Sequence, residues 1–273
     1  MIKLKDQADS LRKIVRERKM NFSKTKTIGV FSGKGGVGKS IFALNLALAL
    51  NDLKKRVLLV DCDLGLFNLS VLMGLDNEAN SNFNKVLSGE ESWTKNIHRT
   101  VYGIDFLGGS ESRENPSEVS LGFIGDIERS NKYQYIIVDT GPGVHPIILD
   151  AVNYTELNVV VTNPELTSIT DSYALIKSLI AEESTGLFHL IINRCTSASE
   201  VEGTFYRLEQ VLKRFLEVKL YSLGYIPEDK IVRESVKEQY PAFLLKPYTP
   251  SMVGIRSIAR KIASSDYTTK HEV

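Results

Sequence analysis

Residues 27–50 read TIGVFSGKGGVGKSIFALNLALAL, which is an apolar run, a glycine-rich loop and a second, longer apolar run. The β-branched and aromatic residues before the loop favour a strand, and the apolar run after it has the length of a helix. Glycines let consecutive backbone N–H groups curl around phosphate oxygens, and a helix N-terminus adds partial positive charge. The spacing from Gly33 to Lys39 and Ser40, in this strand–loop–helix setting, is that of a Walker A loop. The stretch predicts a site for a nucleoside triphosphate.

Two side chains of this loop have specific tasks in such a site. Lys39 is expected to reach the β- and γ-phosphates, and the Ser40 hydroxyl is expected to ligate Mg²⁺. The residues expected to contact the nucleotide in this part of the chain are Gly33, Lys34, Gly35, Gly36, Val37, Gly38, Lys39, Ser40 and Ile41.

Apolar runs rich in Val and Ile recur along the chain and alternate with segments of helical period. Their hydrophobicity is continuous rather than alternating, which is typical of strands buried on both faces of a parallel sheet. The order predicts a doubly wound, mostly parallel α/β domain with helices on both faces. Strands are expected at 27–33, 56–61, 135–140, 157–162, 187–194 and 219–226, and helices at 38–51, 165–182, 200–217 and 251–263.

The composition indicates one globular domain. The chain has 273 residues, of which 42% are hydrophobic and 25% charged, and its net charge of +1 favours neither nucleic acid nor membrane. We predict a basic amphipathic segment at 1–24, a P-loop ATPase domain at 25–264 and a polar tail at 265–273. Residues 240–250, with three prolines, predict an irregular loop before the last helix.

Localisation is predicted to be cytoplasmic. We find no apolar run of the roughly 20 residues that a spanning helix needs, and no apolar signal core near the N-terminus. Cys62 and Cys195 lie in separate apolar stretches rather than in a paired framework, so we expect free thiols in a reducing compartment.

Carboxylates follow two of the predicted strands. Asp61 and Asp63 follow RVLLV, and Asp139 ends YIIVD. Ligands of open α/β sheets bind at the carboxyl ends of strands, so these side chains are expected near the nucleotide. An Asp that ends a hydrophobic strand is the Walker B pattern, in which the carboxylate holds Mg²⁺ directly or through water. Alternatively, Asp63 only caps the next helix.

A short loop, Gly141–Pro142–Gly143, follows Asp139 and could move when the γ-phosphate leaves. Pro142 stiffens this segment and has no N–H. Any backbone contact with the γ-phosphate must therefore come from Gly141 or Gly143.

The string KGGVGKS at 34–40 resembles the deviant Walker A motif of the MinD/ParA superfamily. The resemblance implies an Mg-dependent ATPase that forms a homodimer in the ATP state, with Lys34 reaching the partner subunit's nucleotide. It also implies that Asp63 positions the attacking water and that Ser40, Asp63 and Asp139 form the Mg²⁺ set. The alternative for Lys34 is a solvated loop lysine.

Four further residues are placed around the adenine by the same resemblance. Asn193 would bind the edge of the base, and Ile226 and Pro227 would pack against it, with Arg194 beside them. An asparagine at the end of a strand is otherwise a common turn former.

Within the superfamily, Asp6–Arg12 (DQADSLR) and the stretch 163–177 resemble the FlhG family, also called YlxH or FleN, of flagellar number and placement ATPases. In that family the N-terminal segment stimulates the GTPase FlhF. The resemblance implies that residues 1–20 do the same here, with Gln7 as the activating side chain. Flagellar switch (C-ring) proteins and a flagellar transcription regulator are further candidate partners. The alternative is a basic arm that shields a sheet edge.

The predicted helix 251–263 combines an apolar stripe with basic residues. The pattern suits either a helix packed on the sheet, which we favour, or one lying on anionic lipid at the inner membrane face or the cell pole.

Three other functions use the same scaffold. A MinD-type division-site regulator differs in lacking the N-terminal segment. A ParA-type partition ATPase would bind DNA as a dimer with strong salt dependence, and the charge pattern does not favour it. The absence of any CxxC pair argues against a metal-cluster carrier.

Overall fold

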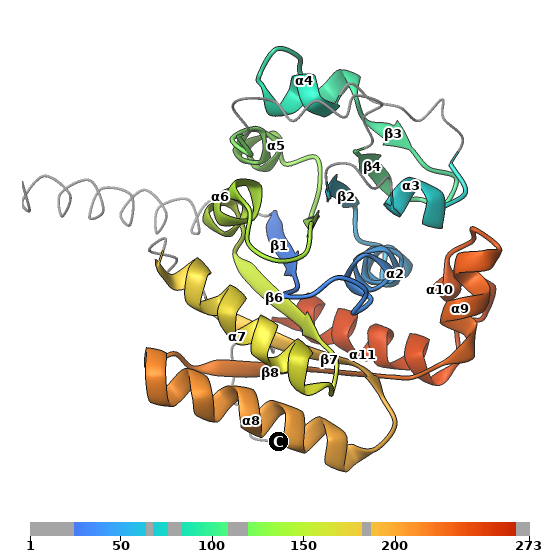
Figure 1. The fold of residues 1–273 in the computed structure, drawn as a ribbon. Helices are drawn as coiled ribbons and strands as arrows, with labels where there is room; N and C mark the ends of the chain where they lie inside the picture. The colour runs from blue at the N-terminus through green and yellow to red at the C-terminus, as the bar shows by residue number, and fades with distance from the viewer. Residues whose placement is uncertain (1–24, 64–67, 76–82, 109–119, 182–186, 266–273) are drawn as a thin grey trace, which may run out of the picture.

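The computed structural model describes residues 25–63, 68–75, 83–108, 120–181 and 187–265. They form one eight-stranded sheet with helices on both faces (Figure 1). The strand order is β3-β4-β2-β5-β1-β6-β7-β8, and among these strands only β3 and β4 pair antiparallel. This confirms the predicted doubly wound, mostly parallel fold. The strands are β1 (Lys26–Phe31), β2 (Val57–Cys62), β3 (His98–Arg99), β4 (Asp105–Leu107), β5 (Tyr135–Thr140), β6 (Leu157–Thr162), β7 (Phe188–Cys195) and β8 (Leu220–Pro227).

The helices that the sequence predicted are all present. They are α2 (Lys39–Asp52), α7 (Leu166–Ala181), α8 (Ala198–Leu216) and α11 (Pro250–Ser264). The structure adds shorter elements that periodicity did not reveal, because they are too brief to show a repeat. These are α3 (Asn68–Leu72), α4 (Phe83–Leu87), η2 (Trp93–Lys95), α5 (Phe123–Ser130), α6 (Pro146–Tyr154), α9 (Lys230–Lys237) and α10 (Ala242–Leu245).

The prediction of an irregular loop at 240–250 was wrong in part. Pro241 precedes α10 and Pro250 begins α11, so two of the prolines stand at helix starts. Proline is well tolerated there, because the first N–H groups of a helix have no intrahelical partner.

Helix α2 is apolar all round and lies at the centre of the molecule. Every residue from Phe42 to Leu50 is buried. Such a helix needs packing partners on all sides. It contacts β2 and β5 of the sheet and is covered by α11, α10 and α3. The phosphate loop therefore leads directly into a helix that is buried on all sides.

Two apolar layers fill the space on the two faces of the sheet. One contains side chains of α2, α3, α10 and α11, and the other contains side chains of α4 to α8. In Figure 1, α7 and α8 cross in front of β7 and β8, and α11 passes behind them. Met252, Ile255, Ile258 and Ile262 of α11 are buried, so this part of the apolar stripe packs on β8 and α2, as favoured, whereas Val253 is 51% exposed.

Two further expectations can be compared with the structure. Cys62 and Cys195 are buried free thiols. Within the described ranges, we find no helix with both the length and the apolar character that crossing a bilayer requires. The segments 1–24 and 266–273, including Gln7, lie outside the described residues.

Candidate functional site

The phosphate loop between β1 and α2 has the backbone that an anion cradle needs. Gly36 and Gly38 have φ values of 77° and 92°, a region that glycine adopts without strain. A Cβ on Gly38 would lie 2.3 Å from the side-chain nitrogen Nδ2 of Asn193, so a larger residue there would be strained at this φ and would displace that amide. No described atom stands within 4 Å of the Cβ position of Gly36. The loop thus offers N–H groups and open space at the N-terminus of α2.

Lys39 lies at the centre of the predicted catalytic residues. Its Nζ donates to Asp139 Oδ1 at 2.7 Å and to Ser40 Oγ at 3.3 Å, and lies 4.0 Å from Asp63 Oδ2. The side chain of Lys39 is 6% exposed and that of Asp139 is fully buried. In a buried ion pair of this kind, the attraction between the two groups offsets part of the cost of removing each from water. The structure therefore brings Lys39, Ser40, Asp63 and Asp139 together.

Asp61 organises the segment that follows β2. Its Oδ1 accepts from the backbone N–H of Asp63 at 3.0 Å, and its Oδ2 accepts from that of Leu69 at 3.4 Å. Asp61 also stands opposite Asp139 in the β2–β5 register. Burial, and next the Asp139 charge, raise the pKa of Asp61 to about 7. Asp61 therefore supports the site by binding the N–H groups of both Asp63 and Leu69.

The donor set fits a magnesium nucleotide. Asp139 Oδ2 is buried without a hydrogen-bond partner among the described residues, and the Ser40 hydroxyl lies close to the same lysine. Mg²⁺ commonly takes one or two protein oxygens and completes its octahedron with phosphate and water. No group of three or more His, Cys, Asp or Glu side chains in the described ranges is arranged to hold a metal ion. Ser40 and Asp139 would hold the ion, with phosphate and water completing its ligands.

The loop after β5 contacts both the phosphate loop and Asp63. The N–H of Gly143 donates to the carbonyl of Ser32 at 2.9 Å, and the Cβ position of Gly141 is 3.3 Å from Asp63 Oδ1. Because Gly143 is engaged and Pro142 has no N–H, Gly141 is the loop residue whose N–H best suits a γ-phosphate contact.

Lys34 lies at the surface and pairs within its own chain. Its Nζ is 3.1 Å from Glu165 Oε2 and 3.2 Å from Thr167 Oγ1, next to the start of α7. The side chains of Lys34 and Glu165 are 41% and 60% exposed. The lysine therefore points away from the buried Lys39 cluster and remains accessible to a second molecule.

A cavity of about 330 Å³ opens beside the phosphate loop, between α2, β7, β8 and α9. The four residues predicted for the base line it, namely Asn193, Arg194, Ile226 and Pro227, together with Ile41 of the predicted phosphate-loop contacts. Its size and apolar lining suit a purine base.

Asn193 has a structural task in this cavity. Its Nδ2 donates to the carbonyl of Val37 at 2.7 Å, and its Oδ1 accepts from the N–H of Arg194 at 3.0 Å. The side chain thus ties the end of β7 to the phosphate loop. The hydrogen bond from Asn193 to the edge of the base remains a prediction. The second hydrogen of Nδ2 is available for it, because the bond to Val37 uses only one.

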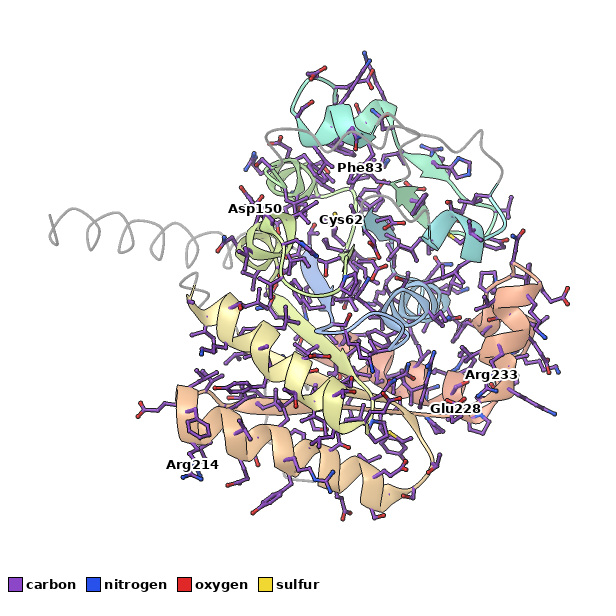
Figure 2. All side chains as sticks on the ribbon, viewed as in Figure 1. Cys62, Phe83, Asp150, Arg214, Glu228 and Arg233 are labelled. Carbon is purple, nitrogen blue, oxygen red and sulfur yellow. The ribbon has the colours of Figure 1, made fainter. Side chains whose placement is uncertain are left out.

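The sequence analysis missed several residues of this cavity. Glu228 and Asp229 follow Pro227, and Asp229 caps α9 by accepting from the N–H of Ile231 at 3.1 Å. An Asp before a helix-period run is a capping signal that could have located this turn. Arg233 pairs with Glu228 at 2.6 Å, and Figure 2 shows both at the start of α9. The remaining lining residues are Gly38, Phe42, Val232, Met252 and Ile255.

Known proteins share this fold and site. A family model described as ParA, NUBPL iron-transfer P-loop NTPase, matches residues 23–263. The chain is 32% identical to the antiactivator FleN of Pseudomonas aeruginosa, over 88% of this chain and 86% of FleN. It is 31% identical to the flagellum site-determining protein YlxH of Helicobacter pylori, over 90% of this chain and 79% of YlxH.

Among solved structures, the septum site-determining protein MinD of Pyrococcus horikoshii, complexed with Mg-ADP, matches with a TM-score of 0.72 and 27% identity. The match covers 89% of this chain and 97% of that one. Together with the glycine cradle and the Lys39 cluster, these similarities confirm the resemblance to MinD, FleN and YlxH. The chain belongs to the ParA/MinD family of P-loop NTPases.

Proposed function

We propose that this chain is a MinD-like, Mg-dependent ATPase that regulates flagellar number and placement and forms a homodimer in the ATP state. The similarity to YlxH, a flagellum site-determining protein, supports the cellular role. The observation that carries the biochemical role is the buried Lys39–Asp139 pair, at 2.7 Å, under the glycine cradle and beside Asp63.

Hydrolysis at this site would rest on positioning and charge rather than on a covalent nucleophile. Bound Mg²⁺ would neutralise charge on the β- and γ-phosphates. Ser40 and Asp139 would hold that ion, and Lys39 would turn from Asp139 to the phosphates. Asp63, 4.0 Å from Lys39, would orient the attacking water.

Dimerisation would depend on Lys34, which is held by Glu165 and Thr167 of its own chain. This pair is exposed, so exchanging it for a phosphate contact across an interface requires little free energy. The phosphate carries more charge than one carboxylate and would be desolvated between the subunits, which strengthens the new contact. ATP would thus favour the dimer.

Replacing Lys34 with alanine is expected to abolish the ATP-dependent dimer. It should change the free energy of unfolding by less than about 1 kcal/mol, because an exposed ion pair contributes little. Light scattering after size exclusion, with ADP and with a non-hydrolysable ATP analogue, measures the dimer. Glu165→Gln is the matched control, because it breaks the same pair but keeps the lysine, and it should still dimerise. A Lys34→Ala protein that dimerises like the wild type would contradict the proposed switch.

We further propose that residues 1–20 stimulate an FlhF-type GTPase. A peptide of these residues is expected to accelerate GTP hydrolysis by a cognate FlhF, and the Gln7→Ala peptide to have no effect, because the activating amide is missing. Phosphate release over time measures both. An FlhF rate that the wild-type peptide leaves unchanged would refute this part of the proposal.

The remaining partners and the location follow from the same proposal. The similarity to FleN, an antiactivator, supports a transcription regulator as one partner. The proposed role in flagellar placement suggests flagellar switch proteins as further partners. The protein would act in the cytoplasm and at the inner membrane face near the cell pole, reaching the membrane through a partner rather than through the buried stripe of α11.

A further inference from the structure

Helix α3, the first described element after Asp63, is held at both ends. At its start, the N–H of Leu69 donates to Asp61 at 3.4 Å. At its end, the Tyr102 hydroxyl donates to the carbonyl of Met73 at 2.7 Å. Tyr102 lies in the turn between β3 and β4, and its own carbonyl accepts from Asn51 of α2 at 3.4 Å. The end of α3 is thus tied to the helix that carries the phosphate loop.

The same tyrosine joins α3 to the helices beside the base cavity. The rings of Tyr102 and Tyr240 meet edge to face, with centroids 5.8 Å apart and an interplanar angle of 83°. Next to them, Gly74 has φ of 60°, and its Cβ position is 2.7 Å from the carbonyl oxygen of Gln239. Only a glycine allows the two backbones to approach this closely.

Helices α9 and α10 form one unit around Tyr240, and the start of α9 forms a wall of the base cavity. Asp229, Val232 and Arg233 of the α9 region line that cavity. Asp229 also accepts from the hydroxyl of Ser251 at 2.9 Å, which fixes the start of α9 to α11. The backbone N–H of Phe243, in α10, donates to Asn45 Oδ1 of α2 at 2.8 Å. The unit of α9 and α10 therefore contacts the base cavity, the phosphate-loop helix and the end of α3.

We infer that Tyr102 is a positioning residue for ATP hydrolysis, acting on Asp63 through the end of α3. This inference rests on the proposed function and deepens it. The hydroxyl–carbonyl bond and the Tyr102–Tyr240 contact fix the end of α3 to the turn between α9 and α10. Leu69 of α3 and Asp63 donate their backbone N–H groups to the same Asp61 carboxylate, so fixing α3 also fixes Asp61 and, through it, Asp63 beside Lys39.

Tyr102→Phe removes the hydroxyl and keeps the ring. It should lower the single-turnover rate of ATP hydrolysis roughly three- to tenfold, the range that the loss of one hydrogen bond predicts for a rate. The affinity for a fluorescent ATP analogue should stay within about twofold, because no nucleotide contact is removed. Amide hydrogen exchange of a peptide spanning 68–75, measured with the same analogue bound, should become faster than in the wild type.

Control variants separate positioning from general destabilisation. Tyr240→Phe keeps the ring contact and should behave like the wild type, whereas Tyr240→Ala should lower the rate as Tyr102→Phe does. Tyr206→Phe, on the outer side of α8 and 62% exposed, should change neither rate nor exchange. Melting temperatures confirm that each variant is folded.

The inference is overturned if Tyr102→Phe hydrolyses ATP at the wild-type rate, or if rate and affinity fall in proportion. A wild-type chain that binds the analogue but does not hydrolyse ATP would instead refute the proposed function. In that case the amide hydrogen exchange of residues 68–75 still decides whether Tyr102 fixes α3. An exchange rate in Tyr102→Phe equal to that of the wild type would reject the inference.

Discussion

Replacing Asp63 with alanine is expected to lower the rate of ATP hydrolysis by on the order of 10²- to 10⁴-fold, the usual effect of removing a group that positions or activates water. Asp63 Oδ2 lies 4.0 Å from Lys39 Nζ, and its Oδ1 faces the loop at Gly141. Binding of ATP should persist, because the substitution removes a negative charge from beside the phosphates. Steady-state phosphate release, with affinity measured separately, tests both statements.

The same variant should accumulate as a dimer in ATP, because the triphosphate that holds the subunits together is no longer consumed. Light scattering in ATP and in ADP measures this state, with and without FlhF. Asp63→Asn is the matched control: it keeps the shape of the side chain, so a similar loss of rate would assign the effect to the charge. A monomer in both nucleotides would count against the switch, and an unchanged rate would remove Asp63 from the mechanism.

The second large effect is expected from Lys39→Met. In the protein without nucleotide, this change leaves the fully buried Asp139 without its cation, which destabilises a fold by roughly 3–5 kcal/mol when one partner of a buried pair is removed. Binding of ATP should also be lost, because the β- and γ-phosphates lose their ammonium partner. Chemical denaturation and nucleotide titration measure the two losses separately.

A double variant distinguishes these two roles of Lys39. Lys39→Met with Asp139→Asn removes the unpaired charge of Asp139, so the part of the lost stability that comes from this pair should return while ATP binding stays absent. Lys34→Met in the same loop should leave stability within about 1 kcal/mol of the wild type, because its pair is exposed. A Lys39→Met protein as stable as the wild type would mean that the Lys39–Asp139 contact carries little free energy.

The destabilisation in Lys39→Met should depend on pH. Burial and the Asp139 charge already raise the pKa of Asp61 to about 7. A carboxyl whose pKa is higher in the folded than in the unfolded protein binds more protons when folded, so stability falls as pH rises between the two values. The positive charge of Lys39 lowers the pKa of Asp61. Without that charge the pKa of Asp61 in the folded protein is higher, so the pH range over which stability falls extends upward. The variant should therefore lose less stability at pH 5 than at pH 8.

Much of the site could be predicted because its residues stand at fixed places in local patterns. Walker A spacing identified the turn from Gly33 to Ser40, and hydrophobic runs located the strands whose last two residues include Asp61 and Asp139. A parallel sheet gathers the carboxyl ends of its strands at one edge, so the cluster around Lys39 followed from the fold class.

Other parts of the site were not visible in the chain because they join residues that are far apart in it. Lys34 meets Glu165 across 131 positions, and Asn193 meets Val37 across 156. No local pattern contains such contacts. Arg233 and the Tyr102–Tyr240 pair were missed for the same reason, and the two-residue strand β3 is too short to show a period.

Sequence pattern alone was thus enough for the fold class, for the phosphate loop and for the placing of Asp61 and Asp139 near Lys39, because each rests on spacing or on hydrophobicity within one element. Tertiary packing was needed to show that Asn193 holds the phosphate loop, that α11 buries its apolar stripe and that α9 connects the base cavity to α3. These properties depend on which surfaces meet after folding, and the free energy of such contacts belongs to pairs of distant residues rather than to any one segment.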